Sequence, residues 1–253
     1  RFQACSMIAG RLRWALTGTP IHNYRSDLQS LAYFIGLQPY SKADWWQTHN
    51  TAEDMNEWKK ACYIYYSKDD MNLNLPKKVM YEHSLDFSED ERQTYDNMKT
   101  EAKELFEEYL DDGATFRFGV LLTKILRLKQ FCNHPYAPLP VDERFSLQMH
   151  DSTKTKKLNE ILSTIPESEK VLVFSQFTNS LELIGQSLDM NGHKGAHMSY
   201  HGGMANAEKE DVLREFESHD DKRILLISIK AGGVGLNLGR ANHVILFDPW
   251  WNR

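Results

Sequence analysis

LISIKAGGVGLNLGRANHVILFDPWWNR, residues 226–253, is the stretch that decides the fold of this chain. Its apolar start predicts one buried strand, residues 243–247 predict a second, and a glycine-dense loop lies between them. Apart from Val234, the loop segment 231–235 holds no bulky residue. In α/β proteins a strand followed by a glycine-rich turn brings bare backbone N–H groups up to a phosphate. The stretch therefore predicts a sheet with a loop that is suited to face a phosphate.

The glycine spacing does not match a nucleotide-binding motif that works alone. Counting from Gly233 and Gly235, the third glycine of a G-x-G-x-x-G fingerprint would fall on Leu238. A Walker A loop needs Lys-Ser/Thr after its last glycine, and none follows here. Two interpretations stay open. Either the loop donates backbone N–H groups to a phosphate, with Lys230 as an adjacent charge, or its glycines serve a tight, closely packed turn.

The chain before this stretch alternates between apolar strands and amphipathic helices. Strands of this kind, apolar on both faces, are typical of a parallel sheet that is covered on both sides. We therefore predict a nearly complete α/β domain over residues 154–253. The predicted strands are 170–175, 195–200, 223–229 and 243–247, and the predicted helices are 156–165, 180–190 and 207–218.

The first half of the chain predicts mostly helices. A short apolar run, 12–16, is predicted as a strand that exits into Thr17-Gly18-Thr19-Pro20. Ser26 and Asp27 are predicted to cap the helix that follows. The tryptophans of the next polar segment are interpreted as core anchors rather than ligand contacts; they are Trp45, Trp46 and Trp58.

Three further segments lead up to the α/β domain. Alternating apolar residues over 79–87 predict a strand with one buried face. Ser88 and Glu91 then form the S-x-x-E capping box of a long acidic helix that ends near Gly113, and another helix ends at residues 132–135. Residues 136–152 contain prolines and charges without periodicity, which indicates a linker.

Composition limits the remaining classes of function. The hydrophobic fraction of 41% permits real cores in a chain of 253 residues. The net charge of −5 is not a basic signature, so nucleic-acid binding would have to come from a local patch. The chain has no signal peptide and no apolar run long enough to span a bilayer, so we expect an intracellular protein.

Cysteine usage argues against a metal site. The three cysteines are far apart in the sequence and form no C-x-x-C pair. Cys132 and His134 have the spacing of a ligand pair, but no second pair accompanies them. We interpret them as a buried cysteine beside a structural histidine and predict no metal.

Several motifs occur in a fixed order along the chain: TGTP at 17–20, LRLKQFCNHP at 126–135, KVLVFSQF at 170–177, KAGGVGLNL at 230–238 and DPWWN at 248–252. Together they resemble the Snf2 family of ATP-dependent DNA translocases in helicase superfamily two. The motif sequences are most similar to those of the Rad5 and Rad16 branch. Some members of that branch carry a cysteine-rich RING insert between the lobes, and this sequence has none. TGTP argues against a DEAD-box RNA helicase, which usually carries Ser-Ala-Thr at that place.

The resemblance implies an α/β fold made of parts of two RecA-like lobes, with parallel sheets flanked by helices and a helical interlobe region. It implies the rear of lobe one at 1–74, interlobe helices at 75–135, a linker at 136–153 and lobe two at 154–253. In such proteins ATP and Mg²⁺ bind between the lobes, and lobe closure and opening drive movement along duplex DNA.

The resemblance also implies roles for individual residues. Thr17, Gly18, Thr19 and Pro20 match motif III, which couples the nucleotide site to the DNA groove. The residues that match motifs IV and V are expected to face DNA or nucleotide, and they are Ser175, Gln176, Lys230, Gly232, Gly233, Gly235 and Asn237.

This sequence departs from the family pattern in three respects. It holds no Walker A loop and no DEAH box, and no motif VI follows DPWWN. Milder substitutions occur at His22, Gly239-Arg240 and Arg253. We therefore expect a fragment that binds and hydrolyses no ATP by itself, since it lacks the phosphate-binding lysine and the Mg²⁺ carboxylate.

The intact protein is expected to be a nuclear DNA-dependent ATPase in DNA repair or in chromatin and transcription control. Its expected partner is double-stranded DNA, with chromatin as a further candidate and no membrane. The alternative is a catalytically inactive truncated derivative that serves only as a DNA- or protein-binding module. A metabolic Rossmann enzyme fails on the glycine spacing and leaves the first half of the chain unexplained.

Overall fold

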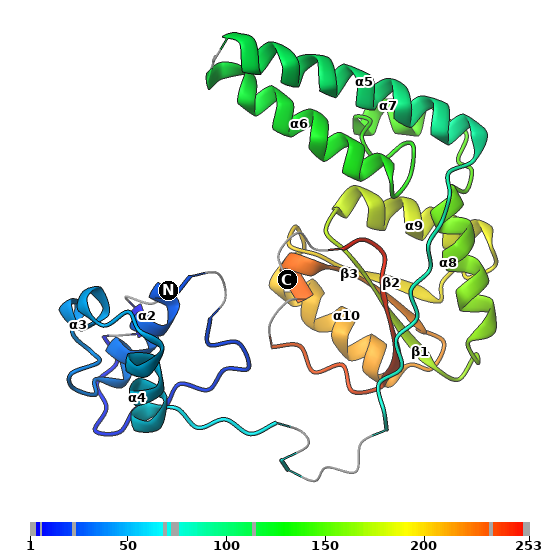
Figure 1. The fold of residues 1–253 in the computed structure, drawn as a ribbon. Coiled ribbons are helices and arrows are strands. Elements are labelled where there is room, and N and C mark those ends of the chain that lie inside the picture. The colour runs from blue at the N-terminus through cyan, green and yellow to red at the C-terminus, as the bar shows by residue number, and fades with distance from the viewer. Residues whose placement is uncertain are drawn as a thin grey trace. The chain divides into compact units, whose positions relative to one another are not determined.

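The computed structural model describes residues 4–5, 7–21, 24–67, 70–71, 76–112, 115–232 and 235–249 (Figure 1). The chain divides into two compact units, Arg1–Tyr81 and Glu82–Arg253. The finer domain boundaries given above stay a prediction. Among the described residues, no helix is both long enough and apolar enough to cross a membrane.

The first unit is organised around three tryptophans on short helices. Trp45, Trp46 and Trp58 are between 4% and 8% exposed and pack in one cluster with Leu28 and Ala32. Their rings meet edge to face, an arrangement that aromatic quadrupoles favour. The structure thus confirms the interpretation of these residues as core anchors. The helices are α2 (Ser26–Ile35), α3 (Ala43–Thr48) and α4 (Ala52–Cys62).

Two predicted strands are wrong. Residues 12–16 and 79–87 both lie outside any strand, and Leu16 and Tyr81 are 93% and 80% exposed. A strand needs a neighbour that accepts and donates its backbone hydrogen bonds, and neither segment is paired with one in the part of the chain described. The prediction that Ser26 and Asp27 cap this helix is wrong as well, because both residues lie within its first turn and Arg25 holds the cap position. Asp27 Oδ2 instead accepts the backbone N–H of Tyr24 at 3.1 Å.

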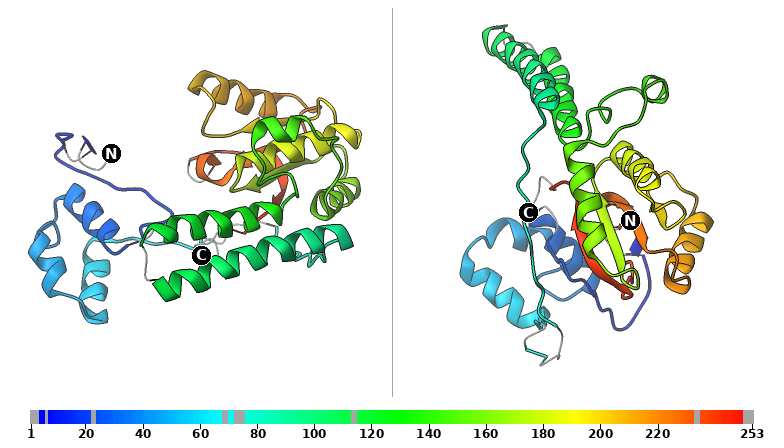
Figure 2. Two further views of the ribbon diagram at one scale, coloured as in Figure 1. Left: turned by 90° about the horizontal axis from the view of Figure 1, so that it is seen from above. Right: turned by 90° about the vertical axis from the view of Figure 1, so that its right-hand side faces the viewer.

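A long helical hairpin opens the second unit. Helices α5 (Glu89–Asp112) and α6 (Thr115–Phe131) lie side by side and antiparallel in all views (Figures 1 and 2). The predicted capping box is confirmed, since Ser88 N donates to Glu91 Oε2 at 3.0 Å and Glu91 N donates to Ser88 Oγ at 3.4 Å. Glu91 also accepts hydrogen bonds from Thr153, so the same carboxylate ties the start of α5 to the start of α8. These bonds lower the pKa of Glu91, although burial alone would raise this pKa.

The rest of the second unit is an α/β domain, as predicted. The described residues form a parallel four-stranded sheet in the order β2-β3-β1-β4. Two strand ends differ from the prediction, because Ile229 already belongs to a helix and Phe247 lies beyond the last strand. The elements are α7 (Val141–Phe145), α8 (Thr153–Thr164), β1 (Lys170–Ser175), α9 (Thr178–Met190), β2 (His197–Tyr200), α10 (Asn206–Ser218), β3 (Ile224–Ser228), α11 (Ile229–Gly232) and β4 (Ala241–Leu246).

Alternate residues of the central strands fill two cores. Val171 and Val173 of β1 pack with α8 and α9 on one face, and Leu172 packs with α10 on the other. The prediction of strands apolar on both faces therefore holds for β1 and β3, which are buried along their length. It is wrong for the edge strand β4, where Val244 and Leu246 are 59% and 68% exposed.

A buried lysine closes one end of the sheet. Lys170 is 3% exposed, and its Nζ lies over the Phe216 ring at 4.7 Å from the centroid. The ammonium donates to three backbone carbonyls: those of Phe216 and His219 (2.6 Å) at the end of α10, and that of Lys222 (3.0 Å) in the segment between α10 and β3. The carbonyls of Phe216 and His219 are among the groups that a helix end leaves without partners within the helix, so Lys170 caps the end of α10 from another element.

We expect Lys170→Met to destabilise the second unit by about 3 kcal/mol, because it leaves buried carbonyls without donors while keeping the side-chain length. Urea unfolding followed by circular dichroism measures this loss. Lys156→Met, at an exposed position on α8, is the matched control and should cost less than about 0.5 kcal/mol. Equal losses in the two variants would contradict the capping role of Lys170.

The interpretation of His134 as a structural histidine is confirmed, whereas Cys132, predicted as buried, is only half-buried. His134 is 1% exposed, its Nε2 lies 2.9 Å from the carbonyl of His150, and its Nδ1 accepts the N–H of Tyr136 at 3.1 Å. These two bonds together require a neutral ring with the proton on Nε2. Burial lowers the pKa of His134, which agrees with the neutral form.

The lowered pKa of His134 predicts a pH-dependent stability. An unfolded histidine has a pKa of about 6.5, so below that pH the unfolded chain binds a proton that the folded chain resists. The stability that neutral His134 contributes is therefore present above about pH 6.5 and is lost as the pH falls toward the lowered folded value.

We expect His134→Gln to flatten the dependence of unfolding free energy on pH between about 7 and 5. Urea unfolding at several pH values measures the slope, and His83→Gln, at an exposed position, should keep the slope of the unmodified chain. A His134 variant with an unchanged slope would show that another group causes the dependence.

Candidate functional site

The candidate site lies where three parallel strands end side by side. Because β1, β3 and β4 are parallel neighbours, their carboxyl ends meet at one edge of the sheet. β1 ends at Ser175 and the turn at Gln176 follows it, helix α11 follows β3, and Asp248 follows β4. Open α/β sheets bind ligands beyond this edge, near the point where connections run to opposite sides.

A buried carboxylate holds the edge together. Asp248 is 4% exposed. Its Oδ1 accepts the backbone N–H of Gln176 at 2.9 Å, and its Oδ2 accepts Asn133 Nδ2 at 2.8 Å and the hydroxyl of Ser175. Three donors from two distant segments thus compensate for the removal of this carboxylate from water.

Ser175, the last residue of β1, and Gln176, the first residue after it, have different environments. Ser175 is fully buried, and besides donating to Asp248 its Oγ accepts the N–H of Phe177 at 3.2 Å. Its hydroxyl therefore supports the turn from inside instead of facing a ligand. Gln176 is half-buried, and its Nε2 donates to the carbonyl of Pro249 at 3.2 Å. Gln176 is the member of this pair that solvent reaches.

The glycine loop begins in α11 with a close packing contact. A Cβ added to Gly232 would lie 2.4 Å from Ile227 Cγ2 and 3.0 Å from Phe174 Cε1, so this position has no room for a side chain. Lys230 on the same short helix is exposed. The packed glycine keeps the start of the loop against the sheet, and the lysine supplies a positive charge beside it.

The remainder of the loop is described from Gly235 onward. Gly235 has φ +81°, a left-handed conformation that favours glycine. Asn237 is exposed, while Leu236 and Leu238 pack against the core on the α10 side. Gly233, Val234 and the residues 250–253 lie outside the described part of the chain.

Two residues that are not among the predicted site residues, Lys154 and Asn133, lie close to Asp248. Lys154 Nζ donates to Asn133 Oδ1 at 3.1 Å and lies 4.9 Å from the centroid of the Phe247 ring. Burial lowers the pKa of Lys154, and the nearby Asp248 carboxylate opposes this effect. The sequence signal for Asn133 is its place in the LRLKQFCNHP motif at 126–135, for which the sequence predicts only a helix end.

This group borders a cavity of about 330 Å³ between the segment before α5, the end of α6 and the start of α8. The cavity is lined by His83, Leu85, Asp86, Phe87, Glu91, Phe131, Cys132, Asn133, Ser152, Thr153 and Lys154.

Among the described residues, no group of three His, Cys, Asp or Glu side chains is placed to share a metal ion.

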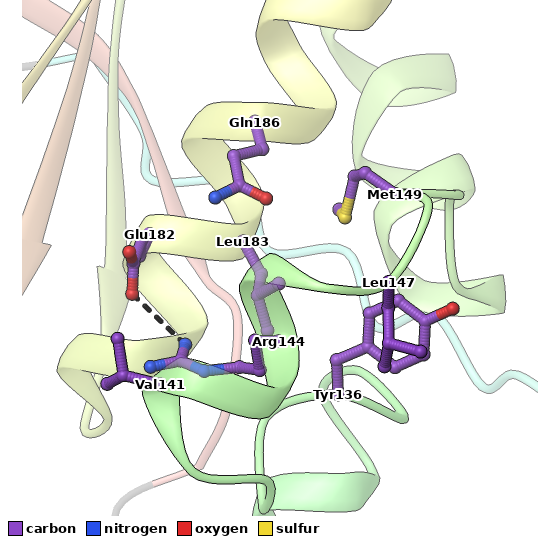
Figure 3. A pocket seen from close by; sticks show the side chains of 8 residues that line it. All are labelled: Tyr136, Val141, Arg144, Leu147, Met149, Glu182, Leu183 and Gln186. Atoms are coloured by element: carbon purple, nitrogen blue, oxygen red, sulfur yellow. Dashed lines mark hydrogen bonds and ion pairs between the residues drawn. The ribbon is translucent and has the colours of Figure 1, made fainter.

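A smaller cavity of about 100 Å³ lies between α7 and α9 (Figure 3). Its wall contains an ion pair in which Arg144 Nη1 lies 3.0 Å from Glu182 Oε2. Apolar side chains, including Leu147, Leu183 and Met149, make up much of the rest. The ion pair ties the segment predicted as a linker to α9, so this segment packs against the α/β domain within the second unit.

The TGTP segment, residues 17–20, belongs to the first unit and is described there by itself. The backbone N–H of Thr19 donates to Thr17 Oγ1 at 3.1 Å, which makes a local turn. Thr17, Gly18 and Thr19 are exposed and Pro20 is half-buried.

Two family models match the chain. Residues 1–137 match the SNF2-related domain, and residues 153–253 match the helicase conserved C-terminal domain. The two matches together cover most of the chain.

Curated relatives show the same likeness. The chain is 29% identical over 262 residues to a probable global transactivator of Orgyia pseudotsugata multicapsid polyhedrosis virus, covering 98% of this chain and 52% of the relative. It is 24% identical to the DNA repair protein rad8 of Schizosaccharomyces pombe, covering 99% of this chain and 35% of that protein. The chain thus spans about half of the first relative and less of the second.

Solved structures agree with the sequence relatives. The Sulfolobus solfataricus SWI2/SNF2 ATPase core in complex with double-stranded DNA matches with a TM-score of 0.58 and 26% identity, over 99% of this chain and 54% of that one. The C-terminal domain of the same ATPase matches with a TM-score of 0.53 and 27% identity, over 66% of this chain and 70% of that one.

We expect Gly232→Ala to destabilise the second unit by about 1–3 kcal/mol, because the new methyl group overlaps Ile227 and forces a shift in packed neighbours. Thermal and urea unfolding measure the effect. Gly202→Ala is the matched control, since a Cβ there meets nothing within 4 Å. Equal stability of the two variants would rule out the close contact at Gly232.

Proposed function

Because the chain belongs to the SNF2-related family, we propose that it forms part of an ATP-dependent translocase that acts on double-stranded DNA. The observation that carries this proposal is the carboxyl edge of the sheet. There Gln176, Lys230 and a glycine-rich loop follow neighbouring strands of a domain that matches a SWI2/SNF2 ATPase core solved with double-stranded DNA.

The proposed contacts follow from the chemistry of phosphate. Lys230 acts as a point charge toward a phosphate, and the backbone of Gly232, Gly233 and Gly235 approaches the same group. Gln176 and Asn237 add neutral hydrogen bonds, which position a nucleic-acid backbone without reading its sequence. In the first unit, Thr17 to Pro20 couple the nucleotide site to the DNA groove.

The residues at this edge fit one side of a nucleotide. Their donors and the Lys230 charge suit a polyphosphate, but the sequence holds no Walker A lysine and no DEAH carboxylates to complete the site. When bound, ATP with Mg²⁺ supplies the phosphoryl-transfer free energy for movement. We propose that the 253-residue chain by itself hydrolyses no ATP.

The biological setting is proposed from the relatives. One is named as a DNA repair protein, and another, from Mus musculus, as an SWI/SNF-related regulator of chromatin. These names support DNA repair or chromatin control in the nucleus as the setting of the intact protein.

We expect Lys230→Ala to weaken binding of the chain to duplex DNA and to reduce the salt dependence of log Kd by about one unit, as loss of one phosphate contact does. Fluorescence anisotropy over a salt series measures both quantities. Lys194→Ala is the matched control. Lys194 is an exposed lysine just before β2, so it lies at the amino-terminal ends of the strands, opposite the candidate site.

Equal effects of the two lysine substitutions would remove Lys230 from the proposed interface. In the same samples, DNA-stimulated ATP hydrolysis by the 253-residue chain alone would contradict its proposed inactivity. Such hydrolysis by the intact protein that contains this chain would support the translocase over the inactive binding module.

A further inference from the structure

Asn133 is buried at the point where the helical hairpin meets the sheet. It follows the end of α6 by two residues and is 1% exposed. Its Nδ2 donates to Asp248 Oδ2 at 2.8 Å and to Ser180 Oγ at 3.0 Å, and its Oδ1 accepts from Lys154 Nζ at 3.1 Å. The side-chain amide thus contacts residues at the end of β4 and at the starts of α9 and α8 at once.

The contact continues from Asp248 to the candidate site. The carboxylate that accepts from Asn133 also accepts the backbone N–H of Gln176 through its other oxygen. Two hydrogen bonds therefore connect the end of α6 to the turn after β1, across 115 and 72 residues of sequence. Gln176 in turn donates to the carbonyl of Pro249, which closes the link on the chain segment after β4.

The chemistry of the link requires an amide at this position. A buried carboxylate is costly unless each oxygen has donors, and Asn133 supplies one without adding charge. An aspartate there would place a second carboxylate against Asp248, and an alanine would leave one acceptor of Asp248 and the Lys154 ammonium without their partner.

We propose that Asn133 is a positioning residue, which holds Asp248 so that the Gln176 turn keeps the conformation that meets DNA or nucleotide. The link also makes this turn sensitive to the position of the α5–α6 hairpin, because Asn133 after α6 and the N–H of Gln176 both donate to the carboxylate of Asp248. The part of the inference that concerns DNA rests on the proposed function; the part that concerns the turn does not.

Amide hydrogen exchange of the 253-residue chain tests the turn directly, since the N–H of Gln176 is itself a member of the link. We expect Asn133→Ala to lower the protection of the Gln176 amide about tenfold or more, equivalent to one lost hydrogen bond of about 1.4 kcal/mol. The amides of Val171 and Val173 in the middle of the sheet should change far less. Asn159→Ala, which removes a half-buried asparagine bonded to Ser187 Oγ at 2.9 Å in the same unit, should leave Gln176 protected.

An exchange of partners separates positioning from general stability. Asn133→Asp alone should lower Gln176 protection, and the double variant with Asp248→Asn should restore most of it, because the amide and the carboxylate then trade places. The carboxylate introduced at position 133 in that variant still faces Lys154. The proposal is overturned if the losses of Gln176 protection in the two single variants simply add in the double variant. It is also overturned if Asn133→Ala lowers the protection of amides uniformly across the sheet.

DNA binding by the same variants distinguishes the two levels of inference. With a short duplex DNA as the probe, we expect Asn133→Ala to weaken binding about threefold or more and the exchanged pair to recover it. If the unmodified chain binds no duplex while the exchange results hold, the proposed function fails and the positioning of the turn stands. If duplex binding is intact in Asn133→Ala although Gln176 has lost its protection, the role of Asn133 toward DNA is overturned.

Discussion

A carboxylate that is removed from water needs hydrogen-bond donors for its oxygens, and Asp248 obtains these donors from parts of the chain that are far apart in sequence. The hydroxyl of Ser175 and the N–H of Gln176 come from the end of β1, and the amide of Asn133 comes from the end of α6. Because the loss of any of these donors removes a hydrogen bond from a buried carboxylate, the carboxyl edge of the sheet and the end of the hairpin at α6 are held in one arrangement.

The glycine loop depends on the same edge. Gly232 has no space for a Cβ because the loop starts against Ile227 and Phe174, both on the sheet face that α10 covers. The glycines have two interpretations, a phosphate-facing loop and a closely packed turn. These two interpretations are therefore compatible. Gly232 serves packing, and Gly235 serves a left-handed backbone, while Lys230 stays exposed beside them.

The predictions that succeeded used local information. The helices α8 and α10 have periodic apolar faces, and α5 has a capping box, so each element is specified within a few turns of itself. The segments 12–16 and 79–87 show how this local information misleads. Their apolar residues suit a strand, but a strand exists only where another strand supplies its hydrogen bonds, and the pattern does not contain that partner.

The sequence by itself determined the α/β class of the second unit, the family and the motifs that end at the sheet edge, because these follow from periodicity and from short contiguous patterns. The tertiary structure alone decided which motif residues are buried, which are exposed and which hydrogen bonds they make. Ser175 is a buried donor rather than a ligand-facing hydroxyl, β4 is half-exposed at the sheet edge, and Asn133 and Lys154 join Asp248. The physical reason is that hydrogen bonds between residues 133 and 248 depend on the folded path of the chain, which no local pattern records.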